Sequence, residues 1–143
     1  MPGILLDSHT LYWLVTGEVP LNEDALVAIG ESQAAGALFV SPITAWELTL
    51  AARKPAHRDP PQLGVGSPQQ WFREAVRAID ARIIPIQQKI ALEAAGVVAA
   101  TGHGDPGDCF LIATAKVRKI PIVTRDGKML EMAGQGYLQI IAC

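Results

Sequence analysis

The sequence predicts an α/β domain in which parallel strands form a sheet with helices on both of its faces. Short apolar runs alternate with segments whose apolar residues recur at helical spacing, from Gly3–Leu6 near the start to Tyr137–Ile141 near the end. This alternation favours parallel pairing with right-handed crossovers. The chain has 143 residues, 50% of them hydrophobic, which is enough for one core, so we expect a single domain over residues 1–143.

The first half of the chain contains clear signals for helix starts. The apolar run Gly3–Leu6 is interpreted as a strand, and the helix that follows it, His9–Val15, has Ser8 available as its N-cap. After a second apolar run at Leu38–Val40, a serine and a proline begin a helix over Pro42–Ala52, because proline favours the first helical position. Residues 54–68 are rich in proline and glycine and are expected to form a loop.

The second half repeats the same signals. A second serine–proline pair begins a helix from Pro68 to about Ile79, and Arg82–Ile86 is interpreted as a buried strand. The remaining elements are expected to be helix Gln87–Ala100, ending near a glycine; a helix from Asp105-Pro106 to Arg118; strand Pro121–Val123; helix Asp126–Ala133; and strand Tyr137–Ile141.

Composition limits the classes of function. The net charge of -2 argues against a protein that coats nucleic acid through bulk positive charge, so any nucleic acid must be held locally. Cys109 and Cys143 match neither a zinc spacing nor a disulfide framework, which favours reduced thiols. The sequence shows neither a run of roughly 18 apolar residues nor a secretory signal, so we expect a cytoplasmic protein without a membrane partner.

Acidic residues stand where the strands are expected to end. Ligands bind at the carboxyl ends of the strands in an open parallel sheet, and Asp7 and Asp126 each follow a predicted strand. Glu47 lies on a helix with apolar neighbours at helical spacing, and an ionised carboxylate removed from water is costly unless it is paired or binds a metal. Asp105 and Asp108 are three apart at a helix start and lie on the same side of its first turn.

Each acid also has a purely structural interpretation. Asp105 and Asp108 imitate a capping box, Asp7 alone could begin a turn, and Asp126-Gly127 is an ordinary turn dipeptide. The joint pattern favours a site, because crowded carboxylates repel one another unless a divalent cation neutralises them. Oxygen ligands select Mg²⁺ or Mn²⁺, and such ions suit phosphodiester hydrolysis.

Four stretches, taken together, resemble the successive motifs of PIN-domain ribonucleases, and their order and spacing are similar to those of the VapC-type toxins of bacterial toxin–antitoxin pairs. They are Leu5–His9, Val40–Leu48, His103–Ala115 and Ile122–Asp126, and they span nearly the whole chain. The resemblance implies a PIN-like three-layer fold with about five parallel strands, homodimerisation, RNA cleavage, and inhibition by a VapB-type antitoxin whose tail enters the active-site groove.

Carried over by position, the resemblance implies that Asp7, Glu47 and Asp108 bind the metal, with Asp126 as a more variable fourth acid and Thr124 as a hydroxyl beside the site. The chain also departs from the family. Gly107 and Cys109 stand where a bulky aromatic residue and an arginine are common, which puts contacts near the RNA backbone in doubt, and Thr44 replaces a common serine.

Several further side chains near the expected site have two interpretations. Basic residues could hold RNA phosphates or could be ordinary solvated charges; they are Arg53, Lys54, Arg58, Arg125 and Lys128. His9 and His103 flank the motifs, and we expect local hydrogen bonds from them rather than a catalytic part. The three tryptophans, Trp13, Trp46 and Trp71, are expected to pack in the core or at a dimer interface.

Three other functions are alternatives to the nuclease. A non-catalytic PIN-fold module that binds antitoxin or RNA is the main alternative, and a cleavage assay with Mn²⁺ separates the two. A phospho-acceptor receiver domain needs paired acids in its first loop, whereas Asp7 is followed by Ser8-His9. A nucleotide-binding dehydrogenase is disfavoured because no G-x-G-x-x-G follows the first strand.

Overall fold

A computed structural model describes residues 3–143 of the chain, and its centre is a five-stranded parallel sheet. The strands lie in the order β3-β2-β1-β4-β5, and every neighbouring pair is parallel. Their bounds are β1 (Ile4–Leu6), β2 (Leu38–Val40), β3 (Arg82–Ile83), β4 (Ile122–Thr124) and β5 (Ile140–Ala142). The predicted α/β class, with a parallel sheet of about five strands, is therefore confirmed.

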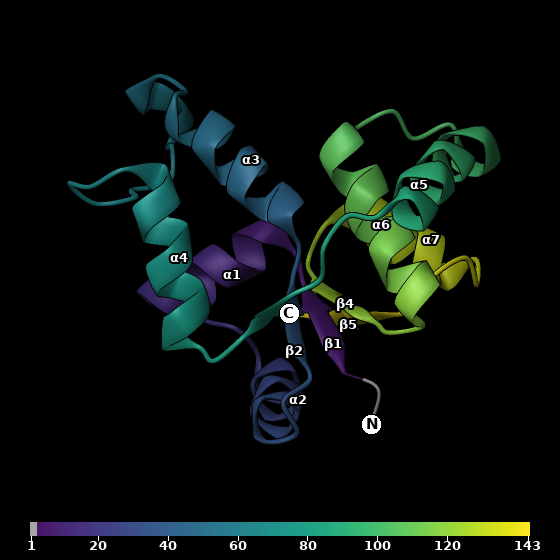
Figure 1. The fold of residues 1–143 in the computed structure, drawn as a ribbon, viewed down its shortest axis with the longest axis horizontal. Helices are drawn as coiled ribbons and strands as arrows, with labels where there is room; N and C mark the ends of the chain where they lie inside the picture. The colour runs from purple at the N-terminus through teal and green to yellow at the C-terminus, as the bar shows by residue number, and fades with distance from the viewer. Residues whose placement is uncertain (1–2) are drawn as a thin grey trace.

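Helices cover both faces of this sheet and complete a three-layer fold (Figure 1). One face carries α5, α6 and α7, and the other carries α1, α2 and α4, with α3 at the upper edge. The helices are α1 (Ser8–Thr16), α2 (Glu23–Ala34), α3 (Pro42–Ala52), α4 (Pro68–Ala78), α5 (Gln88–Thr101), α6 (Pro106–Arg118) and α7 (Gly127–Gly134), with a 3-10 turn at Ala56–Arg58.

The alternation of side chains in β1 explains why two apolar clusters form. Leu5 belongs to the cluster beneath α5 and α6, whereas Ile4 and Leu6 belong to the cluster beneath α1, α2 and α4. All three side chains are fully buried, as expected for a central strand of a parallel sheet. Because β2 and β4 flank β1, the chain segments that follow these three strands emerge at one edge of the sheet.

The helix starts lie where the sequence predicts them, with one correction. Ser41, Ser67 and Asp105 are the N-caps of α3, α4 and α6, and each side chain accepts a hydrogen bond from a backbone N–H of the first turn. The N-cap of α1 is Asp7 rather than Ser8, which is the first helical residue. The Ser8 hydroxyl is thereby free for a contact elsewhere.

Two strands differ from the prediction by more than one residue at an end, and one helix was not predicted. In the stretch predicted as the buried strand Arg82–Ile86, the strand covers Arg82–Ile83, and both residues are exposed because β3 is the edge strand. The last strand begins at Ile140 rather than at Tyr137, which belongs to the turn after α7. Helix α2 was missed because it buries only Ala25, Ile29 and Ser32, too few positions for a clear apolar period.

Other expectations concern the surface. Trp13 and Trp71 pack against the cluster beneath α1, α2 and α4, as the core alternative expects. Trp46 is 47% exposed and lies outside the core, which leaves the dimer-interface alternative for this residue. Within residues 3–143, no helix has the length and apolar character needed to cross a membrane.

Candidate metal centre

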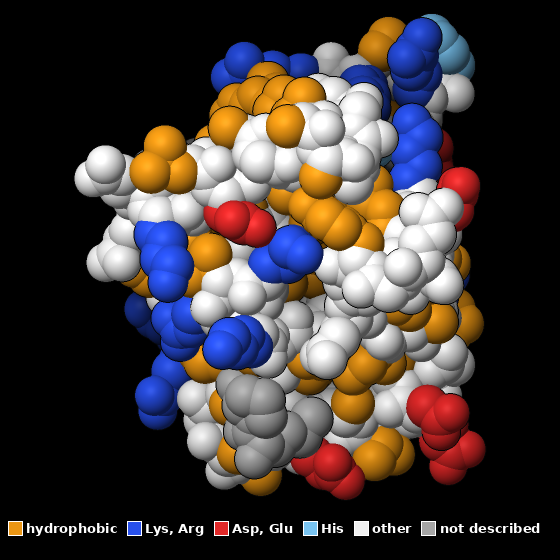
Figure 2. Space-filling view, turned by 90° about the vertical axis from the view of Figure 1, so that its right-hand side faces the viewer, with side chains coloured by type: hydrophobic (Ala, Val, Ile, Leu, Met, Phe, Trp, Pro, Cys, Tyr) orange, Lys and Arg blue, Asp and Glu red, His pale blue; other side chains and the backbone are white. Residues whose placement is uncertain are grey.

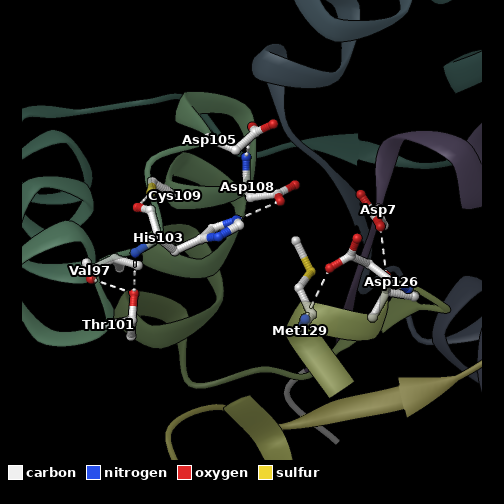
Figure 3. Close-up of polar contacts among 10 residues, drawn as sticks. Asp7, Val97, Thr101, His103, Asp105, Asp108, Cys109, Asp126 and Met129 are labelled. Atoms are coloured by element: carbon white, nitrogen blue, oxygen red, sulfur yellow. Dashed lines mark hydrogen bonds and ion pairs between the residues drawn. The ribbon is translucent and has the colours of Figure 1, made fainter. Parts of the chain in front are cut away.

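Five acidic side chains from four separate stretches of the chain line one cleft with a volume of about 400 Å³. They are Asp7, Glu47, Asp105, Asp108 and Asp126. Figure 3 shows the carboxylates of Asp7, Asp108 and Asp126 facing a common space between the start of α6 and the ends of β1 and β4. The fold thus gathers all the acids that the sequence singles out at the predicted edge of the sheet.

Asp7 is held where β1 passes into α1. Its backbone N–H donates to the carbonyl of Val123 on β4 at 3.1 Å, so the β1–β4 ladder fixes its main chain. Its carboxylate accepts the backbone N–H of Ser8 at 2.7 Å and the hydroxyl of Thr124 at 2.6 Å. Thr124 is fully buried, and its oxygen also accepts the backbone N–H of Asp126 at 3.0 Å. One hydroxyl therefore aligns the acids that follow β1 and β4.

Glu47 reaches the cleft from the second turn of α3. The Ser8 hydroxyl lies 2.5 Å from its Oε1 and 3.1 Å from the hydroxyl of Thr44, which is fully buried. Its other oxygen lies against the first turn of α6 at Gly107, where a Cβ would overlap the Glu47 carboxylate. The absence of a side chain at Gly107 therefore leaves space that Glu47 fills.

Asp105 and Asp108 stand on the first turn of α6. Asp105 is exposed, and its Oδ1 accepts the backbone N–H of Asp108 at 3.1 Å, so the capping interpretation of Asp105 is correct as far as it goes. Asp108 does not return a bond to the cap; its Oδ2 lies 2.8 Å from Nε2 of His103. Both acids lie near the positive end of the α6 dipole, which favours negative charge.

Asp126 is the N-cap of α7, and its Oδ2 accepts the backbone N–H of Met129 at 3.0 Å. The turn-forming role expected of an Asp-Gly pair is therefore present. It does not exclude a second role, because only one of the two carboxylate oxygens is used and the side chain lines the acid cleft.

Burial and mutual repulsion perturb the ionisation of these acids. Burial is the main cause that raises the pKa of Glu47 from 4.5 to about 7; the Ser8 hydroxyl opposes it, and the charges of Asp7, Asp108 and Asp105 add to it. Burial likewise raises the pKa of Asp7 and of Asp108, against the hydrogen bonds from Thr124 and His103. Ionising all of these carboxylates is therefore unfavourable unless a cation offsets their mutual repulsion.

The donor set fits a hard divalent cation. One carboxylate oxygen from each of Glu47, Asp105 and Asp108 lies within 4.8 Å of the other two. Within residues 3–143 this tight group does not include Asp7 or Asp126, which line the same cleft. An all-oxygen cluster of this kind suits Mg²⁺ or Mn²⁺ rather than zinc.

The basic residues near the site differ in their surroundings. Lys54 lines the acid cleft, Lys128 lines a neighbouring cleft, and Arg53 lines an apolar groove between α3 and α4. The guanidinium of Arg125 donates to the carbonyl of Cys143 at 2.6 Å and to that of Pro20 at 3.1 Å. Its internal bonds give Arg125 a structural role that the sequence did not reveal.

Two side chains that contact the acids were not assigned to the site from sequence. Ser8 was considered only as a helix cap, although its position directly after Asp7 points it toward α3. His103 was expected to bond locally, and it does, but its partner is the site acid Asp108. The signal that could have found it is its spacing, five residues ahead of Asp108 and across a glycine-containing turn.

Comparisons with known proteins agree with this architecture. The family model described as PIN domain matches residues 4–135. The fold is similar to a chain of a DNA-bound VapBC from Salmonella typhimurium (TM-score 0.67, 17% identity, covering 99% of this chain and 98% of that one). It is also similar to chains of a toxin-antitoxin complex from Klebsiella pneumoniae (0.62, 23%, 97% and 96%) and of FitAcB from Neisseria gonorrhoeae (0.60, 22%, 96% and 96%).

No curated protein matches the sequence. The solved structures share its fold at low sequence identity, and the family model covers most of its length. From these matches we conclude that the chain is a member of the PIN domain family.

Proposed function

We propose that the chain is a metal-dependent ribonuclease that acts as the toxin of a toxin–antitoxin pair. The observation that carries the proposal is the convergence of Asp7, Glu47, Asp105, Asp108 and Asp126 on one cleft. Three of these acids bring oxygens within 4.8 Å of one another, and the pKa of Glu47 is raised to about 7. Crowding of this kind is unfavourable for folding and is relieved by a shared cation, so it points to a ligand.

Each residue of such a site would have one of two roles, holding the ion or orienting a side chain that holds it. Glu47, Asp108 and Asp7 would hold the ion, with Asp105 and Asp126 as additional oxygen donors on either side. When bound, Mg²⁺ or Mn²⁺ supplies Lewis-acid activation of water and of a phosphodiester. Thr124 and Ser8 orient Asp7 and Glu47 through hydrogen bonds of 2.6 and 2.5 Å, so these carboxylates need little rearrangement.

RNA would be held locally rather than by overall charge. Lys54 lies on the acid cleft and can offset the charge of a phosphate entering it. Figure 2 shows lysine and arginine side chains along the top of the molecule and over the left half and centre of this face, with acidic side chains between and below them. A local contact from Lys54 allows phosphate binding by a chain whose net charge is -2.

The toxin role and its partners rest on the structural relatives. The similar chains come from complexes named VapBC, FitAcB and toxin-antitoxin complex, and the match extends over nearly the full length of each chain. A VapB-type antitoxin is therefore the partner we propose. A homodimer is part of the proposal too; apolar side chains remain exposed on α2 and α5, among them Val27 at 53% and Leu92 at 66%.

Purified protein incubated with labelled RNA and Mn²⁺ tests the proposal. We expect the protein to cleave the RNA and cleavage to stop when EDTA is added. Asp108→Asn and Asp7→Asn should each abolish cleavage. Induced expression in a bacterium should arrest growth, and Asp108→Asn should relieve the arrest. RNA binding without any cleavage would instead support the non-catalytic module.

A further inference from the structure

The turn between α5 and α6 places a nearly buried histidine against one of the cleft's acids. The side chain of His103 is 8% exposed and that of Asp108 is 18% exposed, and Nε2 of the imidazole lies 2.8 Å from Oδ2 of the carboxylate (Figure 3). His103 neither lines the acid cleft nor belongs to the tight group of acids. Its contact with the site passes through Asp108.

The main chain on both sides of the ring is fixed. The backbone N–H of His103 donates to the Thr101 hydroxyl at 3.1 Å, and that hydroxyl donates to the carbonyl of Val97 at 2.7 Å. The carbonyl of His103 accepts the thiol of Cys109 at 3.2 Å. The main chain of His103 is therefore held by α5 on one side and by α6 on the other, and its ring contacts Asp108.

The contact with His103 determines which oxygen of the Asp108 carboxylate accepts a hydrogen bond from the ring. A metal-binding aspartate is ionised and can only accept hydrogen bonds, so the bond must run from Nε2–H of His103 to Oδ2 of Asp108. With Oδ2 occupied, Oδ1 is the oxygen left to face the other acids. His103 also lines a neighbouring cleft of about 700 Å³, so its ring stands between that cleft and the carboxylate.

We propose that His103 is a positioning residue that fixes the rotamer of Asp108 for metal binding. This inference rests on the proposed metal-dependent function. Groups that hydrogen-bond to metal ligands orient them, and removal of such a group typically lowers metal affinity about 10- to 100-fold. Cys109 supports the same arrangement from the position where an arginine is common in the family, so this chain uses that position to anchor the turn.

The test compares Mn²⁺ affinity by calorimetry in the full chain and in four variants, three at His103 and one control. His103→Ala removes the donor and should weaken Mn²⁺ binding about 10- to 100-fold. His103→Gln should restore binding to within about threefold, because its amide N–H stands the same number of bonds from Cα as Nε2 of histidine. His103→Asn, one bond shorter, should not restore it. His57→Ala, on the exposed 3-10 turn, is the matched control and should bind as the unsubstituted chain does.

The outcomes separate this inference from the function on which it rests. If the unsubstituted chain binds Mn²⁺ and His103→Ala binds it equally well, the positioning role is wrong and the metal site stands. Loss of RNA cleavage at saturating Mn²⁺ with unchanged affinity would also overturn it, because His103 would then act on the substrate. If the unsubstituted chain binds no Mn²⁺, both the inference and the proposed function fail. Far-UV circular dichroism of each variant shows whether a loss reflects unfolding.

Discussion

Replacing Glu47 by glutamine should stabilise the metal-free protein at alkaline pH. The folded-state pKa of Glu47 is about 7 against an ordinary 4.5, so ionising this side chain opposes folding. At about 1.4 kcal/mol per pKa unit, the difference corresponds to about 3 kcal/mol. Solvent screens this half-buried group, so we expect a gain of about 1–2 kcal/mol, or about 3–7 °C in melting temperature. The glutamine oxygen can still accept the Ser8 hydroxyl.

The pH dependence follows from the direction of the shift. A carboxyl whose pKa is raised on folding contributes stability that is fully present below its unfolded pKa and is lost as pH rises through its folded pKa. In EDTA the unsubstituted chain should therefore lose stability between about pH 5 and pH 8. Glu47→Gln should flatten part of this decline, and the two proteins should melt together near pH 4.5. The pKa values of Asp7 and Asp108 are also raised, so these acids add a slope of the same sign.

Thermal melts in EDTA and in Mn²⁺ provide the assay. In EDTA at pH 8 the variant should melt above the unsubstituted chain, whereas in Mn²⁺ it should gain less, because a ligand has been lost. Glu31→Gln, an exposed change on α2, is the control and should leave both melts unchanged. A variant that is less stable than the unsubstituted chain in EDTA at pH 8 would refute the reasoning.

Three further predictions follow from the same geometry. Gly107→Ala should force Glu47 to move, destabilise the fold by about 1–3 kcal/mol in thermal melts and weaken Mn²⁺ binding in calorimetry. Gly104→Ala is the control: its Cβ would meet nothing within 4 Å, so stability and Mn²⁺ binding should not change. Thr124→Val removes the 2.6 Å hydrogen bond to Asp7 and should lower Mn²⁺ affinity about 10-fold; unchanged affinity would show that Asp7 is held without it. Mn²⁺ binding at pH 6.5 should release a proton from Glu47, so its apparent enthalpy should depend on the buffer's ionisation enthalpy, and this dependence should vanish near pH 9.

Local signals predict most of the architecture. The serine–proline pairs at the starts of α3 and α4 and the αL glycine after α5 mark helix ends through their own backbone and capping preferences, which need no tertiary context. Helix α2 begins with comparable local chemistry, an Asn22 cap followed by Glu23 and Asp24, but its weak apolar period concealed it. The edge strand β3 was predicted too long because pairing with β2, rather than hydrophobicity, sets its length.

The gathering of the acids could be anticipated because parallel strands end at one edge of the sheet. The contacts that orient them could not. Whether the Ser8 hydroxyl points at Glu47 depends on which residue caps α1, and the choice of Asp7 as the cap was open in the sequence. The bond from His103 to Asp108 depends on the path of a turn, and the close approach of Glu47 to Gly107 depends on how α3 packs on α6.

Anomalous diffraction from crystals grown with Mn²⁺ tests the central claim most directly, because the map locates the ion without reference to activity. We expect a manganese peak in the acid cleft within coordination distance of Glu47 and Asp108, with Asp7 or Asp126 completing its oxygen ligands. A cleft that holds no manganese at saturating concentration, or an ion bound elsewhere on the chain, would contradict the account.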